Sequence, residues 1–233
     1  MNDSFLQQLQ PIAYVRTDFA TKFGVPRQSG LIDSLKASIV FEPEYRDPNA
    51  FRGLEGYSYL WVIWQFSEIR SRRWSATVRP PRLGGDTRMG VFATRSPFRP
   101  NHLGLSSLKL DSIEYTKDSG PILHVRGADM MNGTPVYDIK PYLAYTDSHP
   151  DAAGGFTGRT AWQKLECVIP QPLLDQVPAE KRNPLVRILE EDPRPPYQAD
   201  ENRIYGFVFA GLEIRFHVRG SILTVTEVLL PES

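Results

Sequence analysis

Tyr59-Leu60-Trp61-Val62-Ile63-Trp64 is the stretch that decides the fold class of this 233-residue chain. The run is dominated by β-branched and aromatic residues, which are enriched in strands, and it has the length of a strand. Comparable runs lie at 12–15, 38–41, 90–93, 108–113 and 122–125. Because Pro- and Gly-rich connections separate these runs and few helical patterns lie between them, we expect a mostly β barrel or sandwich rather than alternating βαβ units.

The last third of the chain has a different pattern. A shift in composition at 148–158 is typical of a linker or exposed loop. Beyond it, 173–191 is predicted to be helical, with breaks at Pro178 and near Pro184. A three-stranded meander is predicted at 204–209, 212–218 and 222–229, because apolar and polar residues alternate in its middle strand. We therefore expect a β-barrel-like domain at 1–150 and a small α+β domain at 151–233.

The bulk composition is that of a folded protein, with 41% hydrophobic residues. No apolar run approaches the roughly 18 residues that a membrane span needs. Residues 1–10 lack the basic and apolar regions of a secretory signal. Cys167 is the only cysteine and is interpreted as a small buried apolar residue. Together these features favour a cytoplasmic protein without a membrane span.

Several common catalytic patterns are absent. The sequence has no G-x-G-x-x-G after a strand, no Walker A loop and no G-x-S-x-G. Its four histidines are far apart, and none has metal-ligand spacing to Cys, Asp or Glu, so we expect no metal site. Because few protein nucleophiles are available, a cofactor that carries its own reactive group is favoured.

Positive charge is concentrated in one segment, although the net charge of the chain is zero. Between Arg70 and Arg99 there are eight arginines, no lysine and one acid, Asp86. Arginine's planar fork suits carboxylates and phosphates, so the segment indicates a surface that faces an anion. The alternative is that these arginines are scattered over the solvent-exposed surface or paired with distant acids.

Four segments combine Gly and Pro with polar or charged residues in loops. They lie at 22–28 (KFGVPRQ), 79–85 (RPPRLGG), 89–101 (MGVFATRSPFRPN) and 131–142 (MNGTPVYDIKPY). Prolines stiffen such loops, and glycines allow a ligand to approach the backbone. In the third segment a strand is expected to lead into a loop with Arg95 and Arg99, and in the fourth Asn132-Gly133 predicts a tight turn. Each segment alone is also compatible with ordinary turn chemistry.

In this order and at these separations, the four segments resemble the TsaA-like, or TrmO, family of RNA methyltransferases. The resemblance covers nearly the whole chain and includes D-P-R-P-x-Y at 192–197. It implies a β-barrel-like fold and a homodimer with the cofactor near the subunit interface. It further implies transfer of a methyl group from S-adenosylmethionine to N6 of threonylcarbamoyladenosine, beside the anticodon of tRNA.

The resemblance also implies which residues contact the cofactor. Carried over by position, they are Pro26, Arg27, Gln28, Ser67, Glu68, Arg95, Leu105, Asn132, Gly133, Thr134 and Pro135. Ser67 and Glu68 match by position only. The chain departs from the family at Asn132, where D-G-T-P is usual, and at His102-Leu103, where an apolar pair is common.

Chemical roles follow as hypotheses. Arg27 or Arg95 could hold the cofactor's carboxylate, and the backbone at Gly133-Thr134 its adenosine. Asp138 and Tyr142 are candidates to accept the N6 proton, and Arg99 to bind the carbamoyl group or the threonine carboxylate. Asp138 could instead be structural, paired with Lys140 or an arginine. Trp61 and Trp64 are interpreted as core residues rather than as an aromatic cage for the sulfonium.

Two groups of residues are expected to contact tRNA. The first, expected to face the tRNA backbone or the carboxylate of the substrate, is the arginine set Arg72, Arg73, Arg79, Arg82 and Arg88. The second is the C-terminal domain. Two alternatives remain open. One is a methyltransferase of the same fold that acts on another RNA or a small molecule. The other is a non-catalytic RNA-binding barrel.

Overall fold

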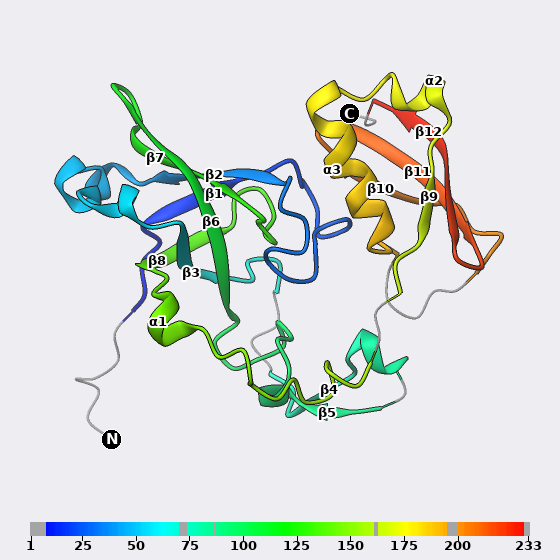
Figure 1. Ribbon diagram of the computed structural model, residues 1–233, viewed down its shortest axis with the longest axis horizontal. Coiled ribbons are helices and arrows are strands. Elements are labelled where there is room, and N and C mark those ends of the chain that lie inside the picture. The colour runs from blue at the N-terminus through cyan, green and yellow to red at the C-terminus, as the bar shows by residue number, and fades with distance from the viewer. Residues whose placement is uncertain (1–7, 70–73, 86, 161–162, 195–199, 231–233) are drawn as a thin grey trace.

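The structure is a computed structural model that describes residues 8–69, 74–85, 87–160, 163–194 and 200–230. It consists of a barrel beside a smaller sheet, with the loop between the first two strands lying between them (Figure 1). This arrangement confirms the predicted mostly β class with a barrel followed by a small α+β unit.

Six antiparallel strands close the barrel in the order β1-β2-β7-β6-β3-β8. Their bounds are β1 Ala13–Arg16, β2 Lys36–Phe41, β3 Tyr59–Gln65, β6 Leu103–Thr116, β7 Gly120–Arg126 and β8 Pro135–Pro141. Five of the six predicted runs of this region therefore lie in barrel strands. Closure removes the unpaired edges that an open sheet of this kind would leave exposed.

The barrel core follows from the period of two in each strand. In β3, Leu60, Val62 and Trp64 point inward and are buried, whereas the side chains between them face outward. Gly104, paired with Trp64 across β3 and β6, leaves room for the indole, since a Cβ there would lie 2.3 Å from the ring. Trp64 is thus a core residue, as predicted, whereas the same prediction is wrong for Trp61, which lies on the outer face because alternate residues of the strand point outward.

Connections between the strands contain short 3-10 helices and one small ribbon. These elements are η2 Pro43–Tyr45, η3 Pro48–Phe51, η4 Leu54–Gly56, β4 Thr77–Val78, η5 Pro81–Leu83, β5 Met89–Gly90 and η6 Val91–Ala93. The predicted strand at 90–93 is wrong, because the chain leaves β5 at Gly90 and turns. In this turn, η6, Val91 is buried and Phe92 is exposed. The chain then continues to Arg95.

The C-terminal unit is a four-stranded sheet in the order β10-β11-β12-β9, packed against helices. Its elements are β9 Glu166–Val168, α2 Gln171–Leu174, α3 Ala179–Glu190, β10 Tyr205–Phe209, β11 Leu212–Arg219 and β12 Ile222–Leu229; α1 Ala144–Asp147 precedes them. The predicted meander and the break at Pro178 are confirmed. The predicted break near Pro184 is wrong: α3 continues through Pro184, and the face formed by Pro184, Leu185, Ile188 and Leu189 is buried.

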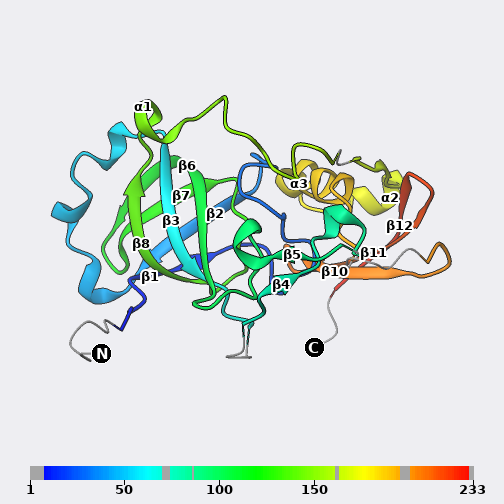
Figure 2. The ribbon, with the colours of Figure 1, turned by 90° about the horizontal axis from the view of Figure 1, so that it is seen from below.

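The two units share a core through the β1–β2 loop, residues 17–35. Phe19, Ile32 and Leu35 of this loop belong to the hydrophobic cluster of the C-terminal sheet. The rings of Phe19 and Phe209 lie 5.5 Å apart. Figure 2 shows the same loop between the barrel and the C-terminal sheet from a second direction. An N-terminal loop therefore fixes where the C-terminal unit sits.

Candidate functional site at one end of the barrel

One end of the barrel collects the loops that carry the predicted cofactor residues. The end of β3 pairs with the start of β6 through Gln65 and Leu103, and Phe66 donates a backbone hydrogen bond to His102. The whole 66–102 segment thus leaves and returns at this end. The start of β8 pairs with β1 at the same end, through Pro135 and Tyr14.

Residues 127–134 run across this end between β7 and β8. Gly127 N–H donates to Leu35, Asn132 N–H to Phe19 and Gly133 N–H to Val15, all at backbone carbonyls. These bonds attach the segment to β1 and to the β1–β2 loop. The segment that carries the Asn-Gly-Thr-Pro motif is therefore held by backbone contacts along its length.

Asn132 shapes the turn that the family usually makes with an acid. Its Oδ1 accepts a hydrogen bond from Thr17 N–H at 3.4 Å. An aspartate could accept the same bond, so the substitution preserves the contact and removes a charge. Gly133 has φ +79°, a left-handed conformation that favours glycine, and Thr134 is buried.

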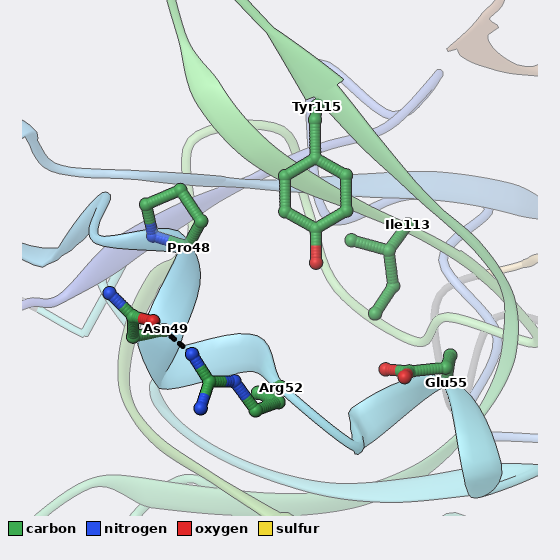
Figure 3. Close-up of a pocket in the computed structure, with 6 residues that line it drawn as sticks. All are labelled: Pro48, Asn49, Arg52, Glu55, Ile113 and Tyr115. Carbon is green, nitrogen blue, oxygen red and sulfur yellow. Dashed lines mark hydrogen bonds between the residues drawn. The ribbon is translucent and has the colours of Figure 1, made fainter.

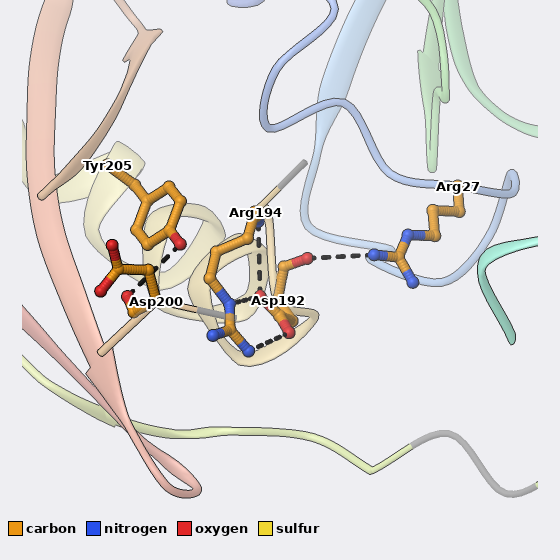
Figure 4. Close-up of polar contacts among 5 residues, drawn as sticks. All are labelled: Arg27, Asp192, Arg194, Asp200 and Tyr205. Atoms are coloured by element: carbon orange, nitrogen blue, oxygen red, sulfur yellow. Dashed lines mark hydrogen bonds and ion pairs between the residues drawn. The ribbon is translucent and has the colours of Figure 1, made fainter. Parts of the chain in front are cut away.

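The 26–28 segment and Arg95 are brought together. Arg95 Nη1 donates a hydrogen bond to Gln28 Oε1, which joins the 66–102 segment to the β1–β2 loop. Arg27 donates to the backbone carbonyl of Asp192, at 3.3 Å (Figure 4). The Asp192 side chain is itself paired with Arg194. The predicted D-P-R-P-x-Y segment thus faces the predicted cofactor loop, although its last residues, 195–197, lie outside the described residues.

A pocket of about 420 Å³ lies between the β1–β2 loop and the C-terminal unit. It is lined by Lys22, Phe23, Gly24, Val25, Pro26, Arg27, Leu31, Ile32, Phe98, Ile188, Glu191, Asp192, Pro193 and Arg194. Two predicted cofactor residues, Pro26 and Arg27, are among them. Of the other predicted residues near this barrel end, Ser67, Glu68 and Leu105 are exposed to solvent.

A second pocket, of about 450 Å³, lies away from this end. It is formed by the 3-10 helices before β3 and the far part of β6 (Figure 3). Its lining residues are Pro48, Asn49, Arg52, Glu55, Ile113 and Tyr115. None of the predicted site residues lies in it.

Asp129 is a polar residue at the barrel end that the sequence patterns did not single out. Trp64 Nε1–H donates to Ser106 Oγ at 2.9 Å, and Ser106 Oγ–H donates to Asp129 Oδ1 at 2.6 Å. Ser106 is buried, and Asp129 is partly buried. The sequence does hold one signal for Asp129: it is an acid between the apolar residues Ala128 and Met130, directly before the segment at 131–142.

Burial raises the pKa of the Asp129 carboxyl above its ordinary value, because a low-dielectric environment disfavours the charged form. The hydrogen bond from Ser106, the nearby backbone N–H groups of Asp129 and Ser29, and the charge of Arg95 oppose this effect. The Asp129 carboxyl therefore contacts or faces β6, the β1–β2 loop and the loop that carries Arg95.

The three residues predicted to be catalytic are not brought together. Asp138 lies on the outer face of β8, paired with Lys140 at 2.9 Å, and its Oδ1 accepts from Ile139 N–H. Tyr142 follows the other end of β8, which is roughly 20 Å from the Asn-Gly turn at 3.3 Å per residue. Arg99 Nη1 donates to the carbonyls of Thr94 and Ser96 within its own loop.

The 74–102 segment carries both arginines and exposed aromatic rings. Arg88 donates hydrogen bonds to the hydroxyl and to the backbone carbonyl of Thr77. Both acceptors are neutral. Arg82 donates to the carbonyl of Thr157. Trp74 and Phe92 are stacked with their ring centroids 6.3 Å apart and are 49% and 73% exposed. Arg72 and Arg73 lie outside the described residues.

Among the described residues, no group of three or more His, Cys, Asp or Glu side chains could hold a metal ion. Within the same residues, no helix is long and apolar enough to cross a membrane.

The fold and the site define a class: a closed antiparallel barrel with a polar site framed by loops at one end. Models of two domains match the chain, the tRNA-methyltransferase O N-terminal domain over residues 14–148 and the TrmO C-terminal domain over 171–230. The chain therefore belongs to the TrmO family.

Individual relatives agree with this assignment. The chain is 38% identical to the tRNA (adenine(37)-N6)-methyltransferase of Escherichia coli K12, over 91% of this chain and 93% of that protein. It is 33% identical to a putative S-adenosylmethionine-dependent methyltransferase of Pseudomonas aeruginosa, over 94% and 96%. A crystal structure of TrmO from Pseudomonas aeruginosa superimposes with a TM-score of 0.76 at 28% identity, covering 96% of this chain and 99% of that one.

Proposed function

We propose that this protein methylates N6 of threonylcarbamoyladenosine at position 37 of tRNA, with S-adenosylmethionine as methyl donor. The observation that carries the proposal is the convergence of the 26–28 loop, Arg95 and the Asn132–Pro135 turn at one end of the barrel. An arginine-rich segment leaves from that same end. The relatives' names supply the reaction and the position of the target adenine. Since that target is tRNA, we place the reaction in the cytoplasm.

The side chains at this end fit the proposed cofactor chemically. S-Adenosylmethionine carries a carboxylate, which suits the exposed guanidinium groups of Arg27 and Arg95. Pro26 and Leu105 provide apolar contact for the adenine, while Gly133 and Thr134 provide backbone groups for its polar edge. When bound, the cofactor would supply an activated methyl group.

The protein's own contribution is mainly alignment. Displacement of a methyl group requires the attacking nitrogen, the methyl carbon and the leaving sulfur to lie in line, which fixed loops favour. The Arg95–Gln28 bond and the backbone bonds of the 127–134 segment hold these loops in place. Arg99, fixed on its own loop carbonyls, is proposed to face the carbamoyl or threonine carboxylate of the substrate.

For tRNA itself we propose the surface formed by Arg79, Arg82, Arg88, Trp74 and Phe92. Arginines contact phosphates without reading sequence, and exposed aromatic rings stack on unpaired bases. The bases of an anticodon loop are unpaired. This surface, which we call the arginine–aromatic surface, would therefore bind the loop next to the modified adenosine, and the C-terminal unit would contact the remainder of the tRNA.

We also propose that the protein acts as a homodimer. Tyr59 of β3 and Leu105 of β6 are large apolar residues exposed on the outer face of the barrel. Association of two copies through this face would remove both side chains from water. Sedimentation equilibrium tests this directly: a Leu105→Asp variant should shift the mass toward the monomer, and a monomeric wild-type protein would refute the dimer.

Calorimetry and methyl transfer together test the proposed function. We expect binding of S-adenosylmethionine and transfer of its labelled methyl group to unfractionated tRNA that contains threonylcarbamoyladenosine. Transfer to tRNA lacking the threonylcarbamoyl group, at an equal rate, would indicate a different RNA substrate. Binding of tRNA without binding of the cofactor would indicate a non-catalytic RNA-binding barrel.

A further inference from the structure

The N6 nitrogen of threonylcarbamoyladenosine needs a proton acceptor. It is part of a urea, so its lone pair is delocalised and its proton must leave as the methyl group arrives. A base should therefore lie at the barrel end where the cofactor residues converge. Neither Asp138 nor Tyr142 lies among those loops in one copy of the chain.

Asp138 is also held away from those loops, on the outer face of β8. Its carboxylate pairs with Lys140 and accepts a hydrogen bond from Ile139 N–H, and its side chain is 45% exposed. Asp129 differs in exposure and in position, because it is partly buried and lies between the β1–β2 loop, Arg95 and β6.

We propose that Asp129 is the catalytic base that accepts the N6 proton; this rests on the function proposed above. In the step, N6 forms a bond to the methyl carbon while the carbon–sulfur bond breaks, and its electron pair stays on sulfur. The N6–H bond breaks at the same time. Its electron pair remains on nitrogen, and the proton goes to the Asp129 carboxylate.

The contacts of Asp129 suit this role. Ser106 has a single hydroxyl proton, and because it accepts from Trp64 it directs that proton to Asp129 Oδ1. The carboxylate is therefore oriented by a buried chain rooted in the barrel core. Its partial exposure leaves it accessible to a substrate at the barrel end.

Arg95 is the charged group that acts on Asp129 from the facing loop, and Ser29 and Ser106 act from the others. Burial is the largest effect and raises the pKa of the Asp129 carboxyl above that of a surface aspartate, while the charge of Arg95 lowers it. A base whose pKa is shifted toward the working pH transfers protons efficiently.

The test is single-turnover methylation by Asp129→Asn across a range of pH, alongside calorimetry with S-adenosylmethionine. The amide keeps the shape and the acceptor for Ser106 but cannot take a proton. We expect the methylation rate to fall about 100-fold or more. The part of the pH–rate profile that rises with pH in the wild type should disappear, and the affinity for the cofactor should be unchanged. The control is Asp111→Asn, which removes the acid of β6 that pairs with Arg126 of β7; it should keep the wild-type rate.

Three results would overturn the assignment. One is an Asp129→Asn rate within about threefold of wild type. Another is a loss of cofactor affinity that fully accounts for the lower rate, which would make Asp129 a cofactor ligand. The third is an Asp138→Asn variant that loses the rising limb while Asp129→Asn keeps it.

A measurement on the wild-type protein does not depend on how the variants fold. Carbon-13 NMR of the Asp129 carboxyl should show a titration whose midpoint matches the rising limb of the rate. A midpoint at or below the ordinary aspartate range would contradict the proposal. If the wild type methylates no tRNA, the proposed function fails, and the assignment of a base for that reaction falls with it.

Discussion

At the scale of single residues, Asp129 links stability to pH in a direction opposite to most acids. Its pKa in the folded protein is raised above the ordinary value of 3.8, so the carboxyl is protonated more readily in the folded than in the unfolded protein. The stabilisation that Asp129 contributes is present below about pH 3.8 and is lost as the pH rises through its raised folded-state pKa. Asp129→Asn, which carries no charge, should therefore unfold at a higher urea concentration than wild type near about pH 7.

The control for this prediction is the same comparison in acid, where both side chains are neutral and the two unfolding curves should converge. A variant less stable than wild type at neutral pH would show that burial does not control the pKa of this carboxyl. A more stable but inactive variant would be an example of stability given up at a functional site.

At the scale of elements, the β1–β2 loop depends on Gly24. Its φ is +81°, and an added Cβ would lie 2.4 Å from the ring of Phe207 in the C-terminal sheet. Gly24→Ala should lower the free energy of unfolding by about 3 kcal/mol, since left-handed strain and overpacking add. Gly53→Ala has strain alone, with φ +88° and no atom within 4 Å, and should cost about 1 kcal/mol. Equal costs in urea unfolding would contradict the proposed contact.

Strand β9 carries the only cysteine, which reports on the C-terminal sheet. Burial raises the pKa of the Cys167 thiol to about 12, so the reactive thiolate is scarce. Iodoacetamide at about pH 8 should label the native protein far more slowly than the urea-unfolded protein. Mass spectrometry follows the label, and rapid labelling of the native protein would show that β9 is not packed as described.

Two kinds of pattern predicted strands correctly. The alternation of apolar and polar residues in 212–218 placed β11, and the length and the β-branched and aromatic composition of 59–64 placed β3. The run at 90–93 is apolar without alternation, and there the turn at Gly90 prevails. The role proposed for Asp129 was not predictable, because Ser106 and Trp64 approach it only when the barrel closes.

At the scale of the whole molecule, the arginine–aromatic surface predicts how tRNA affinity responds to salt. Each arginine that neutralises a phosphate releases a counterion, so affinity should fall steeply with salt, and Arg88→Ala should reduce the logarithmic slope by about one. Phe92→Leu should weaken binding about tenfold without changing that slope, because stacking carries no charge. Filter binding at several salt concentrations measures both, and unchanged affinity for both variants would exclude this surface.

The central claim is that this barrel methylates threonylcarbamoyladenosine beside the anticodon. Mass spectrometry of nucleosides in tRNA from a strain that lacks this protein tests the claim most directly. We expect the N6-methylated form to disappear and the unmethylated threonylcarbamoyladenosine to accumulate, with the methylated form restored by the wild-type protein and not by Asp129→Asn. An unchanged level of the methylated nucleoside in the deleted strain would contradict the account.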